Sequence, residues 1–282
     1  MKFYCITYDL DHPCSKLLQS SCMKSGIEFV QIDPLKFSYG DDLLSGEKKL
    51  LYRVSKSGSN QHVSSIEKFL INDETATFYS SSPAVLSKPN QLMIFRENHI
   101  PIPKTVYSVS NNVDLLKKEV KYLGGFPLIL KALGGSHGVG VMKIDSFESL
   151  ISFVDFLYHR GHSLILREFI DVKKSARLIV LGRKVIDSVE YVALKDDFRT
   201  NRGQSPIVQP KIFSKDVQKI ALKAVKVLGK EFGGVDILID KNNRSYVTEV
   251  NFPCNFSRCQ LLTGKDISGM MIDHLLKKSK KL

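Results

Sequence analysis

Three oxygen-bearing side chains in the C-terminal part of the sequence have the types and spacing of a site for a divalent cation. Glu249 and Asn251 stand two residues apart at the end of the apolar run 246–250. Side chains at that spacing in a strand lie on the same face. Asp236 lies in the preceding apolar run, 235–239, and turn-forming residues separate the two runs. The pattern predicts a β-hairpin that carries all three side chains.

The chemistry of this set suits a hard cation. Mg²⁺ prefers oxygen ligands, which it binds at roughly 2.0–2.1 Å. Asp236, Glu249 and Asn251 offer two carboxylates and one amide oxygen, provided that Asp236 faces the same way as the other two. A hairpin that simply exposes polar side chains to water is the alternative, because a short motif needs support from its structural context.

A glycine-rich loop upstream has the composition of a phosphate-binding segment. Lys131 ends an apolar, strand-like run, and four glycines follow between residues 134 and 140. Glycines let backbone N–H groups approach phosphate oxygens closely, and a lysine adds a positive charge. A second strand-like run, 139–144, follows the loop, so the loop is expected to join two antiparallel strands as a flap over a nucleotide. A glycine hairpin without a ligand is the alternative.

The strand-like run 163–170 ends in a carboxylate followed by apolar residues. Glu168 could bind an adenine amino group or a ribose hydroxyl, while Phe169 and Ile170 provide apolar contacts. A buried strand with a glutamate at its edge is the alternative.

Length and composition favour a globular protein of two domains or a few lobes, since 282 residues with 43% hydrophobic residues can bury a sizeable core. No apolar run approaches the ~20 residues of a membrane span, so we expect a soluble, cytoplasmic protein without a membrane partner. The five cysteines are odd in number and lack zinc-ligand spacing. They predict free thiols.

The net charge of +12 raises the alternative of a basic nucleic-acid-binding protein. Four of the lysines lie among the last six residues, and no zinc finger, aromatic RNA-binding signature or dense basic helix is present. The distribution therefore argues against nucleic acid as the partner. A positive field would equally attract an anionic nucleotide and an acidic substrate.

The first 88 residues alternate between strand and helix patterns, which predicts a parallel sheet with crossover helices. The expected strands are 2–8, 27–32, 49–54 and 77–79, and the expected helices are 13–25 and 64–70. Arg53 ends one of these strands, where ligands of open α/β sheets usually bind. It could hold a substrate carboxylate, although a surface arginine is the commoner case.

Lys88 begins a helix, Lys131 precedes the glycine loop, residues 167–170 end a strand, and Asp236 precedes residues 249–251. This order resembles that of the ATP-grasp fold over nearly the whole chain. The nearest branch is the RimK-like carboxylate–amine ligases, which include ribosomal-protein glutamate ligases and amino-group-carrier ligases of lysine biosynthesis. Further local matches are residues 181–186, 197–201, 234–238 and 263–267.

The resemblance implies an α/β chain whose ATP-grasp part is α+β. It would comprise an N-terminal α/β lobe (1–88), a central lobe with the flap (89–172) and a C-terminal lobe with the metal site (173–282), the last two clasping ATP. The nucleotide-binding residues would be Lys88, Lys131, Gly135, Ser136, Gly138, Glu168, Phe169 and Ile170. The metal ligands for two Mg²⁺, or for Mn²⁺, would be Asp236, Glu249 and Asn251.

The activity implied by the resemblance is ATP-dependent joining of a carboxylate to an amine through an acyl phosphate, on an amino acid, peptide or protein. Arg199, Asn201 and Lys131 would act in catalysis, and Arg177, Arg199, Asn201 and Arg258 would bind the substrate. The alternatives are a nucleotide-binding protein without turnover and the nucleic-acid-binding protein. The sequence leaves open whether two chains associate as a homo-oligomer.

Three departures from the usual pattern of this branch surround the expected acceptor pocket. Ser175 stands where an acid is usual, residues 202–204 replace an arginine–glycine–glycine run, and residues 252–258 replace a serine–proline–glycine turn. The resemblance therefore supports the ATP chemistry more firmly than the choice of substrate.

Overall fold

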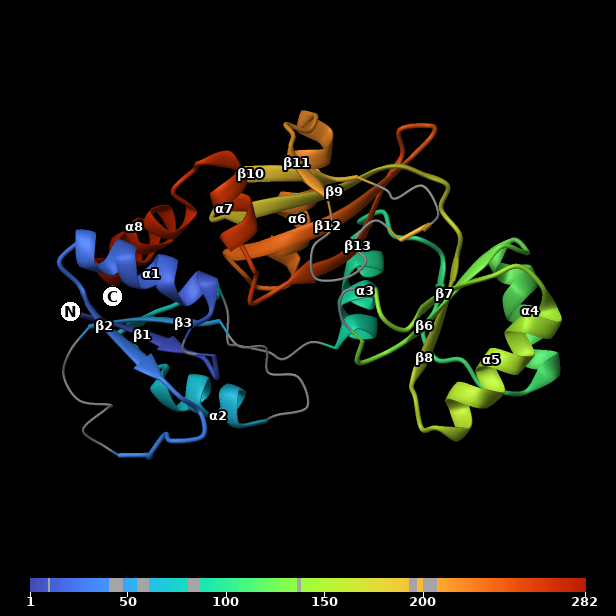
Figure 1. Ribbon diagram of the computed structural model, residues 1–282, viewed down its shortest axis with the longest axis horizontal. Coiled ribbons are helices and arrows are strands. Elements are labelled where there is room, and N and C mark those ends of the chain that lie inside the picture. Colours follow the sequence, from blue (N-terminus) through green and yellow to red (C-terminus); the bar gives the residue numbers. More distant parts are fainter. Residues whose placement is uncertain are drawn as a thin grey trace.

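The computed structural model describes residues 1–9, 11–40, 48–54, 61–80, 87–135, 138–192, 197–199 and 207–282. Three β-sheets follow one another along the long axis of the molecule, each with its own helices (Figure 1). Both chain ends lie at the same end of the molecule (Figure 1). Within the described ranges, no helix combines the length and the apolar character needed to cross a membrane.

The N-terminal sheet is parallel, with the strand order β2-β1-β3-β4, which confirms the predicted crossover architecture. Its elements are β1 (Lys2–Ile6), α1 (Pro13–Lys24), β2 (Glu28–Ile32), β3 (Lys49–Arg53), α2 (Gln61–Leu70) and β4 (Thr75–Ala76). The strand expected at residues 77–79 is wrong. Thr75 and Ala76 pair with β3 instead, and Tyr79 forms an isolated bridge to Lys230 in another part of the chain.

The expectation that Arg53 lies on the surface is also wrong. Its side chain is 4% exposed, and its Nε lies 2.9 Å from Oε2 of Glu67 on α2. The hydroxyl of Tyr79 donates a hydrogen bond to the same Glu67 oxygen at 3.0 Å. A carboxylate and a phenol from elsewhere in the chain therefore make burial of this arginine tolerable.

The second sheet along the chain lies at the end of the molecule away from the chain ends (Figure 1) and is antiparallel, with the strand order β5-β8-β6-β7. Helices α4 and α5 cover one face of it, where the side chains of every second residue of β6 and β8 form a core. The elements are β5 (Thr105–Val106), α4 (Val113–Leu123), β6 (Leu128–Ala132), β7 (Val141–Ile144), α5 (Phe147–His159) and β8 (Leu164–Glu168). Gly124 ends α4 in the left-handed conformation that is common at helix C-termini.

The third sheet is antiparallel, with the order β11-β10-β9-β12-β13. Its strands are β9 (Val172–Leu181), β10 (Lys184–Tyr191), β11 (Val208–Pro210), β12 (Phe232–Asp240) and β13 (Ser245–Asn251), and the helices that pack against it are α3 (Lys88–Glu97), α6 (Lys215–Val227) and α7 (Ser257–Thr263). The last helix, α8 (Ile267–Ser279), packs instead against α1, β3 and β4 of the N-terminal part. Leu92 and Phe95 of α3 share a core with Val247 and Val250 of β13. Helix α3 begins at residue 88, where the boundary between the first two lobes is expected, and it packs on the third sheet. The boundary itself stays a prediction.

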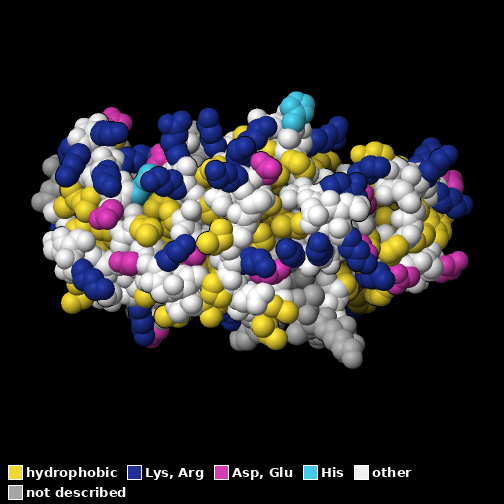
Figure 2. All heavy atoms as spheres, turned by 90° about the horizontal axis from the view of Figure 1, so that it is seen from above, with side chains coloured by type: hydrophobic (Ala, Val, Ile, Leu, Met, Phe, Trp, Pro, Cys, Tyr) yellow, Lys and Arg dark blue, Asp and Glu magenta, His cyan; other side chains and the backbone are white. Residues whose placement is uncertain are grey.

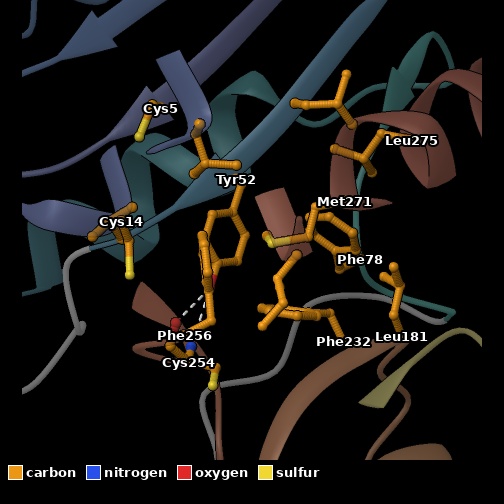
Figure 3. Close-up of a cluster of buried hydrophobic side chains, with 14 of the residues drawn as sticks. Cys5, Cys14, Tyr52, Phe78, Leu181, Phe232, Cys254, Phe256, Met271 and Leu275 are labelled. Carbon is orange, nitrogen blue, oxygen red and sulfur yellow. Dashed lines mark hydrogen bonds between the residues drawn. The ribbon is translucent and has the colours of Figure 1, made fainter. Parts of the chain in front are cut away.

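A buried cluster joins the N-terminal sheet to the third sheet. Phe78 and Phe232 pack together there with Met271 and Leu275 of α8 (Figure 3). The hydroxyl of Tyr52 accepts a hydrogen bond from the backbone N–H of Cys254 at 3.1 Å (Figure 3). Helix α1 lies beside α8 over the same cluster (Figure 1). The segment after β13 is therefore fixed by side chains from both ends of the chain.

All five cysteines are buried and free, which confirms the prediction of free thiols. Burial raises the pKa of Cys5 and Cys22 to about 12. These groups therefore remain protonated at neutral pH and act as small apolar side chains of the core.

Candidate active site

The hairpin expected from the sequence is formed by β12 and β13, and its three oxygen-bearing side chains meet on one face. Asp236 lies directly across from Glu249 in the register of the two strands. The side-chain amide of Asn251 donates hydrogen bonds to Oδ2 of Asp236 at 3.0 Å and to Oε1 of Glu249 at 3.4 Å. Residues 15 positions apart in the chain are thus brought within hydrogen-bond distance by strand pairing.

Two lysines from different elements reach this face. Nζ of Lys88, at the start of α3, lies 2.8 Å from Oε2 of Glu249. Burial acts to raise the pKa of Glu249, but Lys88 and Lys131 outweigh it and lower that pKa to about 2. Burial also lowers the pKa of Lys131 to about 8, with Lys88 and Arg167 acting in the same direction. Cations from α3 and the second sheet therefore converge on a carboxylate of the third sheet.

Arg177 of β9 pairs with Asp236, which lies directly across from it in the sheet. Its Nε and one terminal nitrogen each lie 2.7 Å from a different oxygen of that carboxylate. Burial raises the pKa of Asp236, although Arg177 acts against this. The guanidinium carbon also lies 5.4 Å from the ring centroid of Tyr191. The arginine predicted to face substrate thus forms an ion pair with a predicted metal ligand.

The donor set fits a hard divalent cation by its chemistry. Within the described parts of the chain, no three His, Cys, Asp or Glu side chains form a metal-binding group. Asp236, Glu249 and Asn251 instead combine two carboxylates with one amide, and carboxylate and carbonyl oxygens are the ligands of Mg²⁺. Lys88 and Arg177 hold positive charge against the two carboxylates. Binding of a cation would therefore require these two side chains to move or to share the oxygens.

The glycine loop joins the antiparallel strands β6 and β7, as expected for a flap. A Cβ atom at Gly135 would lie 2.2 Å from the carbonyl oxygen of Val139, so this position admits no side chain without rearrangement. Gly138 has a φ of 76°, the left-handed region that favours glycine. Ser136, the third loop residue predicted to contact nucleotide, lies outside the described residues.

Arg199 connects a segment of the third lobe to this flap. Its guanidinium pairs with Asp197 through two contacts of 3.0 Å. One terminal nitrogen also donates to the carbonyl oxygen of Gly138 at 3.2 Å. The structure therefore brings this predicted catalytic residue to the glycine loop. Asn201, predicted to act beside it, lies outside the described residues.

The end of β8 carries the residues expected along the adenine and ribose. Oε1 of Glu168 accepts a hydrogen bond from the backbone N–H of Lys104 at 2.7 Å. Nζ of Lys143 lies 5.3 Å from the ring centroid of Phe169, and Ile170 is half-buried. Arg258 lies apart from this segment, half-buried in the first turn of α7.

The fold also brings to the site several residues to which the sequence assigned no role. Oε1 of Gln91 on α3 accepts a hydrogen bond from the backbone N–H of Val250 at 3.2 Å, which ties α3 to the hairpin. Asp197 and Tyr191 hold Arg199 and Arg177. Arg167 is buried inside β8. For Arg167 a signal was available, since it is a charged residue within an otherwise apolar strand.

A family model of the RimK-like ATP-grasp domain matches residues 85–275. The chain belongs to the RimK-like ATP-grasp family. It is 31% identical over 214 residues to a probable alpha-L-glutamate ligase of Vibrio parahaemolyticus, covering 75% of this chain and 68% of that one. A probable alpha-L-glutamate ligase of Rhodopirellula baltica is 26% identical over 277 residues, covering 93% of this chain and 67% of the relative.

Solved structures share the fold of this RimK-like protein. The ATP-grasp ligase PsnB in complex with a minimal precursor superposes with a TM-score of 0.76 at 18% identity, covering 99% of this chain and 100% of PsnB. D-alanine–D-alanine ligase of Bacillus anthracis superposes with a TM-score of 0.67 at 18% identity, covering 100% of this chain and 98% of the ligase. The predicted ATP-grasp fold is confirmed.

Membership of the RimK-like ATP-grasp family makes the chain an ATP-dependent ligase that forms carbon–nitrogen bonds. The enzymes of this family bind ATP with Mg²⁺. The activity predicted from the resemblance is therefore confirmed at the level of the reaction type. The roles of individual residues stay predictions.

Proposed function

We propose that this ligase joins the carboxylate of an amino acid, peptide or protein to an amine, with an acidic amino acid such as L-glutamate as one substrate. The names of the related ligases support glutamate. The observation that carries the proposal is the convergence of Lys88 and Lys131 on Glu249, beside Asp236 and Asn251. Carboxylate oxygens that could bind a metal and ammonium groups that could bind phosphates therefore lie together at this position.

ATP would lie between the flap and the end of β8. Lys88 and Lys131 would bind its phosphates, and the backbone of the glycine loop would cover them. The complete proposed nucleotide set is Lys88, Lys131, Gly135, Ser136, Gly138, Glu168, Phe169 and Ile170. The close approach at Gly135 supports this, because a side chain there would fill the space next to the loop backbone.

Asp236, Glu249 and Asn251 would hold two Mg²⁺ ions, or Mn²⁺ in their place. When bound, such ions would neutralise the negative charge of the phosphates. The positively charged side chains of the protein would change partners when the ions bind. Lys88 would leave Glu249 for a phosphate oxygen, and Arg177 would share Asp236 or turn toward the substrate carboxylate. Both carboxylates would then be available to metal.

Phosphoryl transfer depends mainly on positioning and charge neutralisation. The substrate carboxylate would attack the γ-phosphorus, giving an acyl phosphate and ADP, and the amine would then displace phosphate to leave an amide. Lys131, Arg199 and Asn201 would stabilise the negative charge of the transferred phosphoryl group. Arg177 and Arg258, together with Arg199 and Asn201, would orient the substrate. The contact of Arg199 with Gly138 supports its position beside the phosphates.

Two further features belong to the proposal. The lobes would divide at residues 88 and 172, with ATP held between the central and C-terminal lobes. The cytoplasm would be the location of the enzyme, because the reaction consumes ATP and the five thiols are free.

The experiment is ADP and phosphate release with Mg²⁺-ATP against a panel of amino acids, dipeptides and peptides, followed by mass spectrometry of the products. A carboxylate substrate labelled with ¹⁸O is expected to transfer one ¹⁸O to the released phosphate, because the acyl phosphate carries a substrate oxygen to it. ADP release that requires both substrates, together with a new amide, is the expected result. Amide formation without transfer of the label would contradict the acyl phosphate.

Two other outcomes would point to the alternatives. ATP binding without ADP release under every pairing would favour a nucleotide-binding protein without turnover on these substrates. Steeply salt-dependent binding to RNA or DNA that ATP does not alter would favour the nucleic-acid-binding protein.

The surface does not favour that alternative. Figure 2 shows Lys and Arg side chains spread along the length of one face, with hydrophobic side chains between them, rather than gathered in one basic patch.

A further inference from the structure

Arg167 is a buried cation that the proposed reaction does not use. It lies on β8, next to Glu168, and the residue is 7% exposed. Among the described residues, its Nε has no hydrogen-bond partner. A guanidinium offers five N–H donors and no acceptor. Burying a donor without a hydrogen-bond partner is energetically unfavourable, because the group loses its contacts with water, so an arginine at this position calls for an acceptor.

The pairing of β6 with β8 determines where this side chain points. Residues directly across from each other share a face of the sheet, and the register pairs Ile129 with Arg167 and Lys131 with Ile165. Arg167 and Lys131 are therefore on the same face. The opposite face carries Leu128, Leu130, Leu164 and Leu166, which pack against α4 and α5. Arg167 thus projects toward the side on which Lys131 meets the hairpin.

The electrostatic surroundings of Arg167 agree with this direction. Burial lowers its pKa to about 10, while Glu249 and Tyr107 act to raise it. Glu249 already has a direct ion pair with Lys88 at 2.8 Å, and Lys131 is also near it. Neutralising Glu249 therefore does not require a third cation. The Nε–H of Arg167 is therefore an unused donor on the face of the sheet where Lys131 lies.

We propose that Arg167 donates hydrogen bonds to the bound nucleotide, and so is a further nucleotide-binding residue of this ligase. The inference rests on the proposed function, because it requires that ATP occupies the space between the flap and β8. The acceptor is either a phosphate oxygen or an acceptor atom of the adenosine. Arginine suits either one, since its planar fork presents paired donors to phosphate and to base edges.

If Arg167 stabilises the fold, its replacement should lower the midpoint of thermal unfolding of the ligand-free protein, whereas a role in nucleotide binding alone predicts no such loss. If Arg167 serves only the nucleotide, the unpaired charge destabilises the free enzyme. Arg167→Met, an apolar side chain of similar length, is then expected to leave the midpoint of thermal unfolding unchanged or higher without nucleotide. The upward shift of that midpoint by saturating Mg²⁺-ADP is expected to shrink, because the variant binds nucleotide more weakly.

Affinity is measured by isothermal titration calorimetry of the full-length protein, with ADP, adenosine and tripolyphosphate as separate probes in the presence of Mg²⁺. Arg167→Gln is expected to weaken ADP binding by about tenfold or more, as expected for a lost charge-assisted hydrogen bond. Arg167→Lys should recover part of the affinity. Lys118→Gln is the matched control, since it removes an exposed cation from α4 of the same lobe, and it should change the affinity less than twofold.

The probes separate the two sources of the acceptor. Weaker binding of tripolyphosphate with unchanged adenosine binding assigns Arg167 to the phosphates, and the reverse assigns it to the adenosine. ADP affinity within twofold of wild type in both Arg167→Gln and Arg167→Met would overturn the inference and leave the ligase intact. Loss of thermal stability that is equal with and without ADP would likewise overturn it in favour of a structural role. A wild-type protein that binds no probe would instead overturn the proposed nucleotide site itself.

Discussion

Replacing Arg53 by methionine should destabilise the protein far more than removing a surface cation. The Arg53–Glu67 pair joins β3 to α2 at 2.9 Å, with side chains that are only 4% and 6% exposed. Methionine fills most of the space of the arginine but leaves the Glu67 carboxylate buried with the hydroxyl of Tyr79 as its hydrogen-bond donor. The carboxylate then has no guanidinium beside it.

The size of the effect follows from this burial. Removing one partner of a buried ion pair typically costs about 3–5 kcal/mol, because an uncompensated charge stays in the interior. Exposed pairs contribute only about 0–1 kcal/mol. The pair Lys2–Glu28, at 3.9 Å with side chains 40% and 62% exposed, provides the matched control. Lys2→Met should therefore cost about 1 kcal/mol or less.

The dependence on pH has a definite sign. Burial raises the pKa of Glu67, and Arg53 partly opposes this. A folded-state pKa above the unfolded value means that stability falls as the pH rises through the folded pKa. Without Arg53 that pKa rises further, so the deficit of Arg53→Met relative to wild type should be largest near pH 7 and narrow as the pH falls.

Urea denaturation followed by circular dichroism at several pH values measures these differences. The double variant Arg53→Met with Glu67→Gln should recover part of the lost stability, because it removes the unpaired carboxylate. A loss of stability for Arg53→Met no larger than that for Lys2→Met would show that the buried Arg53–Glu67 pair does not stabilise the fold. A deficit that widens toward low pH would contradict the expected dependence on pH.

Two further predictions concern the third sheet. Gly234→Ala should cost about 1–3 kcal/mol of folding stability by overpacking, because a Cβ atom there would lie 2.6 Å from Sγ of Cys254. Adding Cys254→Ala should restore most of the lost stability, as measured by the same urea denaturation. Burial acts to raise the pKa of Glu231, but His274 and Lys278, each 2.9 Å away, hold it below its usual value. The stability from these contacts is therefore present above the unfolded pKa of about 4.5 and lost as the pH falls below it; Glu231→Gln should lower the stability at pH 7 and flatten its decline toward pH 3, and an unchanged decline would count against the assignment.

Local patterns were sufficient to predict the parts of the site that lie close together in the sequence. The hairpin of β12 and β13 joins neighbouring segments, so strand alternation alone put Glu249 and Asn251 on one face. The flap was predictable for the same reason, because β6 and β7 flank a short glycine loop. The resemblance to a known family then supplied the order in which these local units are arranged.

Contacts between distant segments were not predictable from the sequence. The pairing of Arg177 with Asp236 depends on the register of β9 against β12, and a shift by one residue would separate them. The burial of Arg53 depends on Glu67, which α2 brings to it. Arg167 is buried beside a sheet neighbour, Ile129, that is distant from it in the sequence. These are properties of the tertiary structure, and propensity carries no information about them.

The most direct test of the account compares Glu249→Gln with wild type in an assay of substrate-dependent ADP release. Glutamine keeps the shape of the side chain but removes the charge that Lys88 and Lys131 face and that a metal would bind. The exposed Glu28→Gln serves as the control for loss of a carboxylate elsewhere. Glu249→Gln is expected to be folded, as judged by circular dichroism, and to lose amide formation, while Glu28→Gln is expected to keep wild-type turnover. Wild-type amide formation by Glu249→Gln would contradict the assignment of the hairpin as the metal and phosphate site.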